Sequence, residues 1–431
     1  MAMGMPQAEL LRRSLVPQTF KKICVIGLGY VGLPTAAVMA SRGLDVTGID
    51  INPNTISLIN QGKIHIFEPN LETMVHDAIE AGMLRAKSEP VEADAFIVAV
   101  PTPFTDGNKP DLKYIEAATK SLAPVLKKGD LVIIESTSPV GATEQVSQWL
   151  ADLRTDLSFP HSTGADADVQ VSHSPERVLP GRVLIELVRN DRVIGGISRH
   201  CAERTAELYR SITDGTCHVT TARTAELVKL MENAYRDVNI AFANEMSLVS
   251  DRLGINVWEA IDMANHHPRV NILQPGPGVG GHCIAVDPWF IIDGAPEDTA
   301  LIRAARGVNN SKPGHVVKQV LDAAKKHAAP TIACLGLAYK ANIDDLRESP
   351  AIDVVRQLSE AKAGRVLVVE PNIDTLPDEL ASLEQTSLCD LSDALDQSDI
   401  IVLLVDHSPF LAVNRARLEN KTIFDTRGIW R

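Results

Sequence analysis

Three features are missing from this sequence of 431 residues, and each absence excludes a class of protein. No apolar run approaches the roughly 20 residues that a membrane-spanning helix needs, and the longest runs have the length of a strand. Cationic residues are not in excess, because 42 lysines and arginines face 55 aspartates and glutamates, which gives a net charge of -13. We therefore expect no membrane span and no binding surface for nucleic acid or for an anionic membrane.

Closely spaced cysteines are the third missing feature. The sequence has six cysteines, neighbouring ones are at least 16 residues apart, and no C-x-x-C occurs. A disulfide framework or a metal site is therefore not predicted. Residues 1–20 also lack the continuous apolar core of a signal peptide. We expect them to form a disordered extension of a cytoplasmic protein.

Alternating strand and helix patterns are abundant instead. With 45% hydrophobic and 23% charged residues, the chain can form two or three domains with cores of their own. Residues 23–26 have the pattern of a buried strand, a turn with Gly27, Gly29 and Gly32 follows, and a helix and a second strand lead to Asp50. The order G-x-G-x-x-G between a strand and a helix is typical of a dinucleotide-binding turn.

Each residue of this turn has a physical reason to be there. Gly27 permits the tight turn, Gly29 lets the backbone approach a pyrophosphate, and Gly32 allows the helix to pack closely on the strand. The start of the helix then points its free N–H groups at the phosphates. A carboxylate at Asp50 accepts hydrogen bonds from a ribose and repels a 2'-phosphate, which favours NAD over NADP. The alternative is a glycine turn in an ordinary α/β fold.

Two further apolar strands, within residues 93–104 and 129–143, end in loops that contain threonine and proline. In doubly wound sheets, ligands lie outside the carboxyl ends of the strands. Thr102, Thr137 and Thr143 are therefore expected near the cofactor. Each of these threonines taken singly is more often a turn or cap residue.

The C-terminal third repeats this order in a weaker form. Strand-like segments recur within residues 330–340, 365–371, 398–410 and 421–430. We therefore predict a second parallel sheet and a second nucleotide-sized crevice. Because this part lacks the complete glycine triplet, a mononucleotide diphosphate is a more natural ligand for it than a dinucleotide. A domain that only packs is the alternative, since a fold alone does not establish function.

Residues 222–254 lie between the two sheets and have apolar side chains at helical spacing, without an internal proline. This pattern predicts one long helix, which is suited to dimerisation. Lys229, Asn233 and Arg236 fall on one polar stripe of it. The stripe is either a solvated helix face or the lining of a cleft in which the lysine takes part in proton transfer.

Cys283 lies in the glycine-rich segment PGPGVGGHCIAVDP, residues 275–288. A structural cysteine is usually buried in a strand or helix, as the patterns around Cys24 and Cys334 indicate. Backbone N–H groups of a glycine-rich loop can instead stabilise a thiolate or an oxyanion. In an NAD enzyme, the natural partner of such a thiol is an aldehyde. Attack of the thiolate on the aldehyde gives a thiohemiacetal, loss of a hydride from the thiohemiacetal gives a thioester, and hydrolysis of the thioester releases an acid. A structural role for Cys283 is the alternative.

These motifs occur together in one known family. From about residue 21 to its end, the chain resembles the UDP-glucose/GDP-mannose dehydrogenase family in GLGYVGLP, ESTSPVG, SPERVLPG, GGHC-x-x-x-D and GLAYKANIDDLRESPA. The resemblance implies an α/β fold in which two Rossmann-like doubly wound domains are joined by a long central helix and a helical dimerisation region. The implied domains are an NAD-binding domain at 21–213, a central domain with the cysteine loop at 214–312, and a UDP-sugar-binding domain at 313–431.

The segment HHPRVNILQPGPGVGGHCIAVDPWF is similar to that of family members that act on an N-acetylmannosamine sugar. It implies the NAD-dependent four-electron oxidation of UDP-N-acetyl-D-mannosamine to UDP-N-acetyl-D-mannosaminuronate. The product would serve a bacterial surface polysaccharide such as enterobacterial common antigen, and the enzyme would be a cytoplasmic homodimer. Three alternatives stay open: a dehydrogenase of UDP-glucose or UDP-N-acetylglucosamine, a β-hydroxyacid-type dehydrogenase, and a nucleotide-sugar binder without turnover.

The resemblance also assigns roles to residues. Cys283 would be the nucleophile and Lys229 the acid/base, with Asp287 orienting water or the lysine and with Glu176 and Thr137 supporting proton transfer or hydrolysis. The residues implied to contact NAD are Gly27, Gly29, Tyr30, Val31, Gly32, Asp50, Thr102, Thr143 and Arg347. The residues implied to contact the UDP-sugar are Arg177, Val178, Lys229, Asn233, Arg236, His267, Arg269, Gly280, Tyr339, Lys340 and Arg427.

Two details of this assignment concern particular side chains. His267 and Arg269 are implied to reach the substrate of the neighbouring subunit in the dimer. Arg427 stands where the family pattern leads us to expect a lysine. Arginine keeps the positive charge but presents it with a different geometry.

Overall fold

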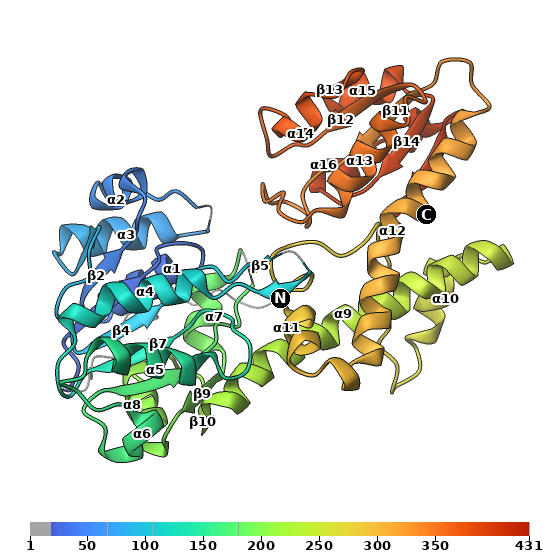
Figure 1. Ribbon diagram of the computed structural model, residues 1–431. Helices are drawn as coiled ribbons and strands as arrows, with labels where there is room; N and C mark the ends of the chain where they lie inside the picture. Colours follow the sequence, from blue (N-terminus) through green and yellow to red (C-terminus); the bar gives the residue numbers. More distant parts are fainter. Residues whose placement is uncertain (1–18, 67, 106, 180, 431) are drawn as a thin grey trace. The chain divides into compact units, whose positions relative to one another are not determined.

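A computed structural model describes residues 19–66, 68–105, 107–179 and 181–430 of the chain. The chain divides into two compact units, the first ending at Met231 and the second beginning at Glu232 (Figure 1). Residues 1–18, most of the predicted N-terminal extension, lie outside the described residues. Phe20 lies inside them and is fully buried in the core of the first unit.

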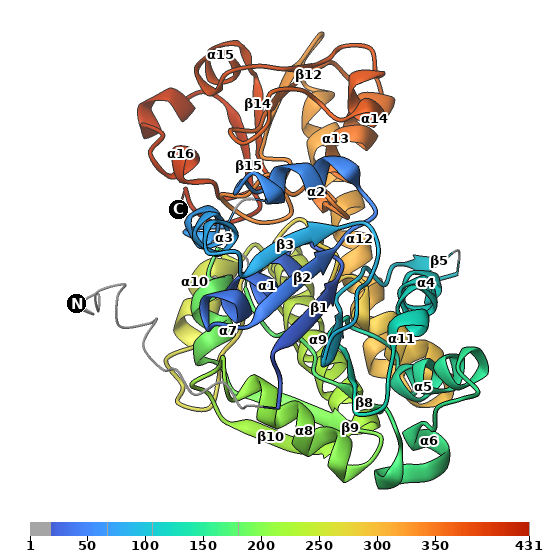
Figure 2. The ribbon, with the colours of Figure 1, turned by 90° about the vertical axis from the view of Figure 1, so that its left-hand side faces the viewer.

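The first unit is built on an eight-stranded sheet with the order β10-β9-β8-β7-β4-β1-β2-β3. Figure 2 shows β1, β2 and β3 side by side at one end of this sheet. All neighbouring strands are parallel except β8 and β9, which are antiparallel. The strands are β1 (Lys22–Ile26), β2 (Asp45–Ile49), β3 (Leu84–Lys87), β4 (Ala95–Val98), β7 (Leu131–Ile134), β8 (Gln170–His173), β9 (Arg192–Gly196) and β10 (Cys217–Thr221).

Helices cover both faces of this sheet, because both faces of its central strands are apolar. In β1, Ile23 and Val25 belong to one core cluster, whereas Cys24 and Ile26 belong to the other. A strand with apolar side chains on both faces must be buried on both faces, which is the doubly wound arrangement. The helices are α1 (Gly32–Ser41), α2 (Pro53–Asn60), α3 (Leu71–Glu80), α4 (Lys113–Leu122), α5 (Ala142–Leu153), α6 (Pro160–Thr163), α7 (Val183–Arg189) and α8 (Arg199–Tyr209).

The second unit contains a parallel sheet with the order β13-β12-β11-β14-β15. Its strands are β11 (Thr331–Leu335), β12 (Arg365–Val369), β13 (Thr386–Leu388), β14 (Ile400–Leu403) and β15 (Thr422–Asp425), and its helices are α13 (Pro350–Glu360), α14 (Asp378–Ala381), α15 (Leu391–Gln397) and α16 (Ser408–Leu411). Residues of β11 again alternate between two cores, with Cys334 in one and Ala333 and Leu335 in the other. The predicted class, an α/β fold with two Rossmann-like sheets, is confirmed.

Helices separate the two sheets in the sequence. The predicted long helix is α9 (Ala222–Leu253), and it is followed by α10 (Val257–Ala264), α11 (Asp287–Gly294) and α12 (Ala300–Ala324) (Figure 1). Short elements complete the structure: the pair β5 (Phe104–Thr105) and β6 (Lys109–Pro110), and the 3-10 turns η1 (Ala123–Val125), η2 (Gly164–Asp166), η3 (Pro296–Asp298) and η4 (Arg415–Leu418). Among the described residues, no helix is both long enough and apolar enough to span a membrane.

Candidate active site

The glycine turn after β1 has the geometry that a dinucleotide requires. Gly27 has φ of +93°, and a Cβ there would lie 2.4 Å from the Ala99 carbonyl oxygen. A Cβ at Gly32 would lie 1.9 Å from the Gly27 carbonyl oxygen, so only glycine lets α1 begin so close to the turn. A Cβ at Gly29 would meet no atom within 4 Å, which leaves this backbone open to a ligand. The turn therefore fits a pyrophosphate.

Asp50 follows β2 and is only partly buried. Its carboxylate accepts hydrogen bonds from the backbone N–H of Leu28, at 3.1 Å, and of Asn52, at 2.9 Å. The acid is thus tied to the glycine turn while one side of it stays accessible. This is the position from which a carboxylate recognises a ribose. Tyr30 and Val31 lie in the same turn, half-buried, and their contact with NAD stays a prediction.

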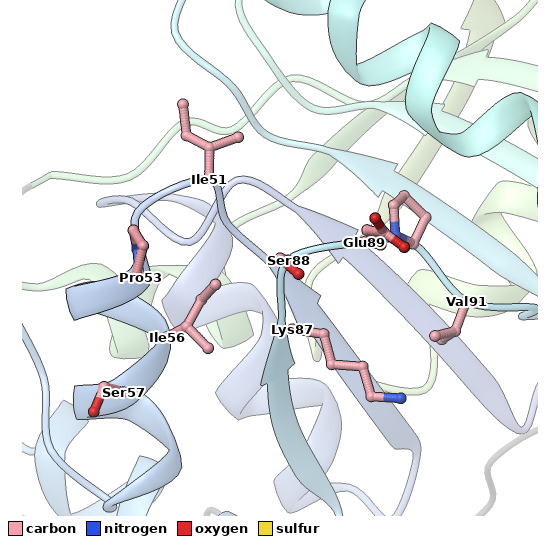
Figure 3. A pocket seen from close by; sticks show the side chains of 9 residues that line it. Ile51, Pro53, Ile56, Ser57, Lys87, Ser88, Glu89 and Val91 are labelled. Atoms are coloured by element: carbon pink, nitrogen blue, oxygen red, sulfur yellow. The ribbon is translucent and has the colours of Figure 1, made fainter.

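A pocket of about 670 Å³ is lined by Ile51, the residue that follows Asp50 in the chain (Figure 3). The residues that line it come from the loop after β2, from α2, and from the end of β3 and the segment that follows it: Ile51, Pro53, Ile56, Ser57, Lys87, Ser88, Glu89, Pro90 and Val91. Apolar side chains dominate on the α2 side. The pocket therefore offers an apolar surface next to the predicted ribose site.

The three predicted threonines take part in hydrogen bonds within the protein, Thr102 and Thr143 through their side chains and Thr137 through its backbone carbonyl. The Thr102 hydroxyl donates to the carbonyl oxygen of Thr137, which joins the loops that follow β4 and β7. The hydroxyl and the backbone N–H of Thr143 both donate to the buried carboxylate of Glu226, on α9. Both donors of Thr143 are therefore used within the protein, whereas its hydroxyl oxygen can still accept a hydrogen bond. The predicted cofactor contacts of these threonines stay untested.

Glu176 lies in a buried cluster of charged groups in the first unit. Arg192, on β9, donates from Nη2 to Glu176 Oε2 at 2.8 Å and from Nη1 to Glu135 Oε1 at 3.4 Å. Glu135 also accepts from the hydroxyls of Tyr209, at 3.1 Å, and Thr35, at 3.1 Å. One guanidinium thus faces two carboxylates. Burial, strengthened by the charge of Glu176 and opposed by that of Arg192, raises the pKa of Glu135 to about 7.

Lys229 lies on α9 and acts electrostatically on His173, at the end of β8. Burial and the charge of Lys229 lower the pKa of His173 to about 3, so this imidazole is neutral. Within the described part of the chain, neither ring nitrogen of His173 has a hydrogen-bond partner. Sequence reasoning missed His173, Glu135 and Arg192; the only available signal was the presence of charged or polar residues inside strand-like segments.

In the second unit, the cysteine loop runs directly into α11. Cys283 is half-buried in a turn, and its carbonyl oxygen accepts the backbone N–H groups of Val286, at 3.1 Å, and Asp287, at 2.8 Å. Asp287 is 2% exposed, and its carboxylate accepts a hydrogen bond from the Asn233 side chain on α9. The structure therefore brings three predicted site residues together. By contrast, burial raises the pKa of the Cys334 thiol to about 12, which keeps it protonated.

The cysteine loop also packs against the second parallel sheet, within the second unit. A Cβ at Gly280 would lie 2.9 Å from the Tyr339 Cβ, and the Gly281 N–H donates to the Arg347 carbonyl oxygen at 3.2 Å. A Cβ at Gly276 would lie 2.7 Å from a guanidinium nitrogen of Arg427. Gly280, Tyr339, Arg347 and Arg427 are thus gathered at the cysteine loop, and Lys340 follows Tyr339 in the chain.

Other predicted substrate residues lie elsewhere. His267 and Arg269 are exposed in the loop after α10, where the Arg269 N–H donates to His267 Nδ1 at 3.3 Å. Arg236 is exposed on α9. Arg177 donates from its side chain to the Asp191 carbonyl oxygen at 3.1 Å, and Val178 packs against the core of the first unit.

Together, the open glycine turn with its acid and the half-buried thiol with its carboxylate define the class of protein: a dehydrogenase that works with a dinucleotide. Three family models match the chain, and their descriptions are the NAD binding domain (residues 21–213), the central domain (223–311) and the UDP binding domain (333–431) of the UDP-glucose/GDP-mannose dehydrogenase family. The chain belongs to this family. The predicted family, the enzyme class and the cofactor NAD are confirmed.

Named relatives resemble the chain over most of its length. An NDP-N-acetyl-D-galactosaminuronic acid dehydrogenase of Ralstonia solanacearum is 59% identical over 411 residues, which is 95% of this chain and 96% of the relative. A UDP-N-acetyl-D-mannosamine dehydrogenase of Escherichia coli (strain K12) is 55% identical over 421 residues, 96% of this chain and 100% of the relative. The solved structure of a UDP-D-ManNAc dehydrogenase of Pyrococcus horikoshii is similar with a TM-score of 0.86, at 40% identity, over 95% of this chain and 96% of that chain.

Proposed function

We propose that the protein oxidises UDP-N-acetyl-D-mannosamine to UDP-N-acetyl-D-mannosaminuronate in two NAD-dependent steps that use Cys283 as nucleophile. One observation carries the proposal: a half-buried thiol on a glycine-rich loop stands next to the buried Asp287 and Asn233 and packs on a sheet of nucleotide-binding type. A loop of this kind supplies backbone N–H groups that favour a thiolate. None of the other five cysteines lies in a loop of this kind.

The proposed chemistry assigns a task to each side chain. When bound, NAD supplies a hydride acceptor for each of the two oxidations. Lys229 takes the proton of the C6 hydroxyl in the first oxidation and that of the thiohemiacetal hydroxyl in the second. Cys283 Sγ forms a bond to the aldehyde carbon and keeps it until water attacks the thioester, which releases the carboxylate and restores the thiol. Asp287 orients that water, and Glu176 and Thr137 support proton transfer.

NAD fits the first unit on three observations. Gly29 leaves open backbone beside the start of α1, Asp50 faces the same turn, and the pocket at Ile51 lies next to Asp50. We propose that the Asp50 carboxylate accepts hydrogen bonds from the hydroxyls of the adenosine ribose. The adenine is proposed to pack against the apolar side chains of Ile51 and Ile56. Tyr30, Val31, Thr102 and Thr143 complete the NAD contacts, together with Arg347 from the C-terminal domain.

We propose that the uridine diphosphate is held by cationic and aromatic groups at the cysteine loop. Arg427 reaches Gly276 in this loop and is itself oriented by Asp406, whose carboxylate accepts from Arg427 Nε at 2.9 Å. Tyr339 and Lys340 lie in the turn after β11, at the carboxyl end of the second sheet. The further contacts proposed for the sugar nucleotide are those of Arg177, Val178, Asn233, Arg236 and Gly280.

A homodimer is proposed from the surface of α9. Tyr235, Phe242 and Val249 follow each other at seven-residue spacing and are 72%, 50% and 42% exposed. Leu227, Met231 and Leu253 continue this apolar stripe along the same helix. A stripe with this spacing is suited to packing against a second copy of the helix. In such a dimer, His267 and Arg269 are proposed to reach the substrate of the neighbouring subunit.

The dimer can be tested with one substitution. We expect Phe242→Glu to convert the protein to a monomer in light scattering, because a charge would be placed in the apolar stripe. Leu411→Glu is the matched control, since it places the same charge at an exposed apolar residue, 59% exposed, on α16 and outside the stripe. A dimer that survives Phe242→Glu would contradict this interface.

The names of two similar relatives point to two different sugars as the substrate. The mannosamine assignment agrees with the name of the Escherichia coli relative, whereas the name of the Ralstonia relative favours an N-acetylgalactosamine sugar as a second candidate. UDP-glucose and UDP-N-acetylglucosamine remain as alternatives within the family. We further propose that the enzyme works in the cytoplasm and supplies a bacterial surface polysaccharide of the enterobacterial common antigen type.

The decisive experiment counts NADH released per molecule of sugar nucleotide supplied in limiting amount. UDP-N-acetylmannosamine, UDP-N-acetylgalactosamine, UDP-glucose and UDP-N-acetylglucosamine are compared. Two NADH with the mannosamine sugar alone are expected. Two NADH with another sugar instead would keep the mechanism and overturn the substrate. One or none with every sugar would overturn the thioester mechanism, for which Cys283→Ser should lower acid formation at least about 10³-fold.

A further inference from the structure

A chain of buried polar side chains links α9 and α12 in the second unit. Asp237, Asn244, Arg306 and Asn309 are 0%, 0%, 4% and 1% exposed. Buried polar groups cost free energy unless they are hydrogen-bonded, so an arrangement of this kind in a helix interface calls for a reason beyond packing.

The hydrogen bonds in this chain have a defined direction. Asp237 accepts from Arg306 Nη1 and from Asn309 Nδ2, both at 2.8 Å. Because a carboxylate is only an acceptor, the NH₂ group of Asn309 must face it and the Asn309 carbonyl must face away. The side-chain oxygen of Asn309, Oδ1, accepts a hydrogen bond from Asn244 Nδ2 at 2.9 Å. Asn244 Oδ1 is then left to accept a hydrogen bond from another group. The ion pair thus decides the orientation of two amides.

The end of this chain is the backbone of the cysteine loop. Asn244 Oδ1 accepts from the Gly276 N–H at 2.9 Å, a bond that is buried. Two residues later, a Cβ on Gly278 would lie 3.4 Å from both the backbone carbonyl oxygen of Asn309 and Pro313 Cδ. The same stretch of the loop therefore packs on α12. If the Asn244 amide were reversed, its NH₂ group would face the Gly276 N–H, donor against donor.

We propose that Asn244 is a positioning residue for the nucleophile. Oriented by the Asp237–Arg306 pair through Asn309, it anchors Gly276 and thereby sets where the Cys283 thiol stands at the end of the loop. The inference rests on the proposed function, because Cys283 is the nucleophile there. The Asn244 side chain bonds to Asn309 and to the Gly276 backbone and not to the thiol, so we expect its effect mainly on the rate of the chemistry.

The test compares variants of Asn244 in the full-length protein. Asn244→Leu keeps the approximate size but removes the acceptor for Gly276. Asn244→Asp keeps an acceptor oxygen for Gly276 and, because burial favours the protonated carboxyl, a donor for the side-chain oxygen of Asn309. Ser247→Ala is the control for a polar change in the same interface of α9 and α12. Ser247 accepts from Lys312 Nζ at 2.8 Å and donates to the Asn244 backbone carbonyl at 2.6 Å, but it has no bond to the loop. Two quantities are measured: the rate of Cys283 alkylation by iodoacetamide, followed by peptide mass, and kcat with KM.

For Asn244→Leu we expect the Cys283 alkylation rate to change at least about five-fold and kcat to fall about 10- to 100-fold while KM stays within about two-fold. Asn244→Asp should recover most of both quantities, and Ser247→Ala should match the wild type. The proposal is overturned if Asn244→Leu alkylates and turns over like the wild type, if Ser247→Ala loses as much, or if Asn244→Asp is no better than Asn244→Leu.

Two controls keep the result interpretable. If Asn244→Leu does not fold, as judged by thermal melting, Asn244→Ser replaces it, because serine is too short to reach Gly276 and the same outcomes apply. Cys283→Ser is measured alongside. If Cys283→Ser keeps its kcat, the proposed function has failed, whereas the alkylation rates of the other variants still report whether Asn244 positions the loop.

Discussion

The two sheets of this protein each place a carboxylate after their second strand, and the two carboxylates do different things. Asp50, after β2, accepts one N–H of the glycine turn and one of its own loop, and it stays partly accessible. Glu370, after β12, is 4% exposed and accepts the N–H groups of Leu337, at 2.7 Å, and Ala338, at 3.0 Å. It also accepts from Asn372 and is bonded to the buried His407 at 2.9 Å.

The difference teaches that equivalent positions in two similar sheets need not share a function. Both oxygens of Glu370 are occupied by protein groups, so this acid stabilises the turn after β11 and has little capacity left for a ribose. We therefore propose that the ligand of the second sheet is recognised by other groups, such as Tyr339, Lys340 and Arg427. This is consistent with a mononucleotide diphosphate in one sheet and a dinucleotide in the other.

The largest effect is expected from removing the internal acid. Glu370→Ala should lower the free energy of unfolding of the second unit by about 3–5 kcal/mol, because His407 and two backbone N–H groups would lose a buried charged partner. Chemical denaturation gives the value, and Asp374→Ala, at an exposed position of the same loop, is the control. A loss below about 1 kcal/mol would show that Glu370 is not a structural acid.

Removing the other acid should affect binding instead. We expect Asp50→Asn to raise the KM for NAD about 10- to 100-fold, because hydrogen bonds to a charged acceptor are worth about 1.5–3 kcal/mol. Weaker repulsion of a 2'-phosphate should also raise the relative activity with NADP. Steady-state kinetics with both cofactors measures these changes, with Asp45→Asn, at the start of β2, as control. An unchanged KM would remove Asp50 from the cofactor site.

A second comparison sets Glu370 against the buried acid of the first sheet, Glu135. Burial works to raise the pKa of Glu370, but its hydrogen bonds with His407, Leu337 and Ala338 outweigh burial and lower it. The stability from Glu370 is therefore present above the pKa of an unfolded glutamate and is lost as the pH falls through its lower folded pKa. Glu135 has a pKa of about 7 in the folded protein. Its contribution to stability is therefore fully present below pH 4.5, the ordinary pKa of a glutamate, and is lost as the pH rises through about 7.

These opposite signs predict a smaller effect that depends on pH. When the pH is raised from 5 to 8, Glu135→Gln should become more stable relative to the wild type. The reason is that the wild type must ionise Glu135 beside the negative charge of Glu176, whereas glutamine has no proton to lose. Glu370→Gln should lose stability relative to the wild type at both pH values. Urea midpoints at the two pH values provide the comparison. A pH-independent difference between wild type and Glu135→Gln would contradict a raised pKa.

Much of the fold could be predicted because buried parallel strands are nearly continuous apolar runs between turn residues. The segments predicted at 330–340, 365–371, 398–410 and 421–430 contain β11, β12, β14 and β15, and the helix predicted at 222–254 is α9. Strands β8, β9 and β10 were not distinguished. They carry polar and charged residues, such as His173 and Arg192, whose burial depends on what the fold places around them.

The sequence by itself determined the class of fold, the glycine turn with its acid, and the unusual setting of Cys283, because these are local patterns whose physical requirements leave few alternatives. Only the tertiary structure decided which polar groups act on each other. Thr143 is turned toward Glu226, Glu176 is held by Arg192, and the cysteine loop is anchored through Asn244. Such contacts join residues far apart in the chain, and the orientation of an amide or the charge of a buried acid depends on partners that no local pattern specifies.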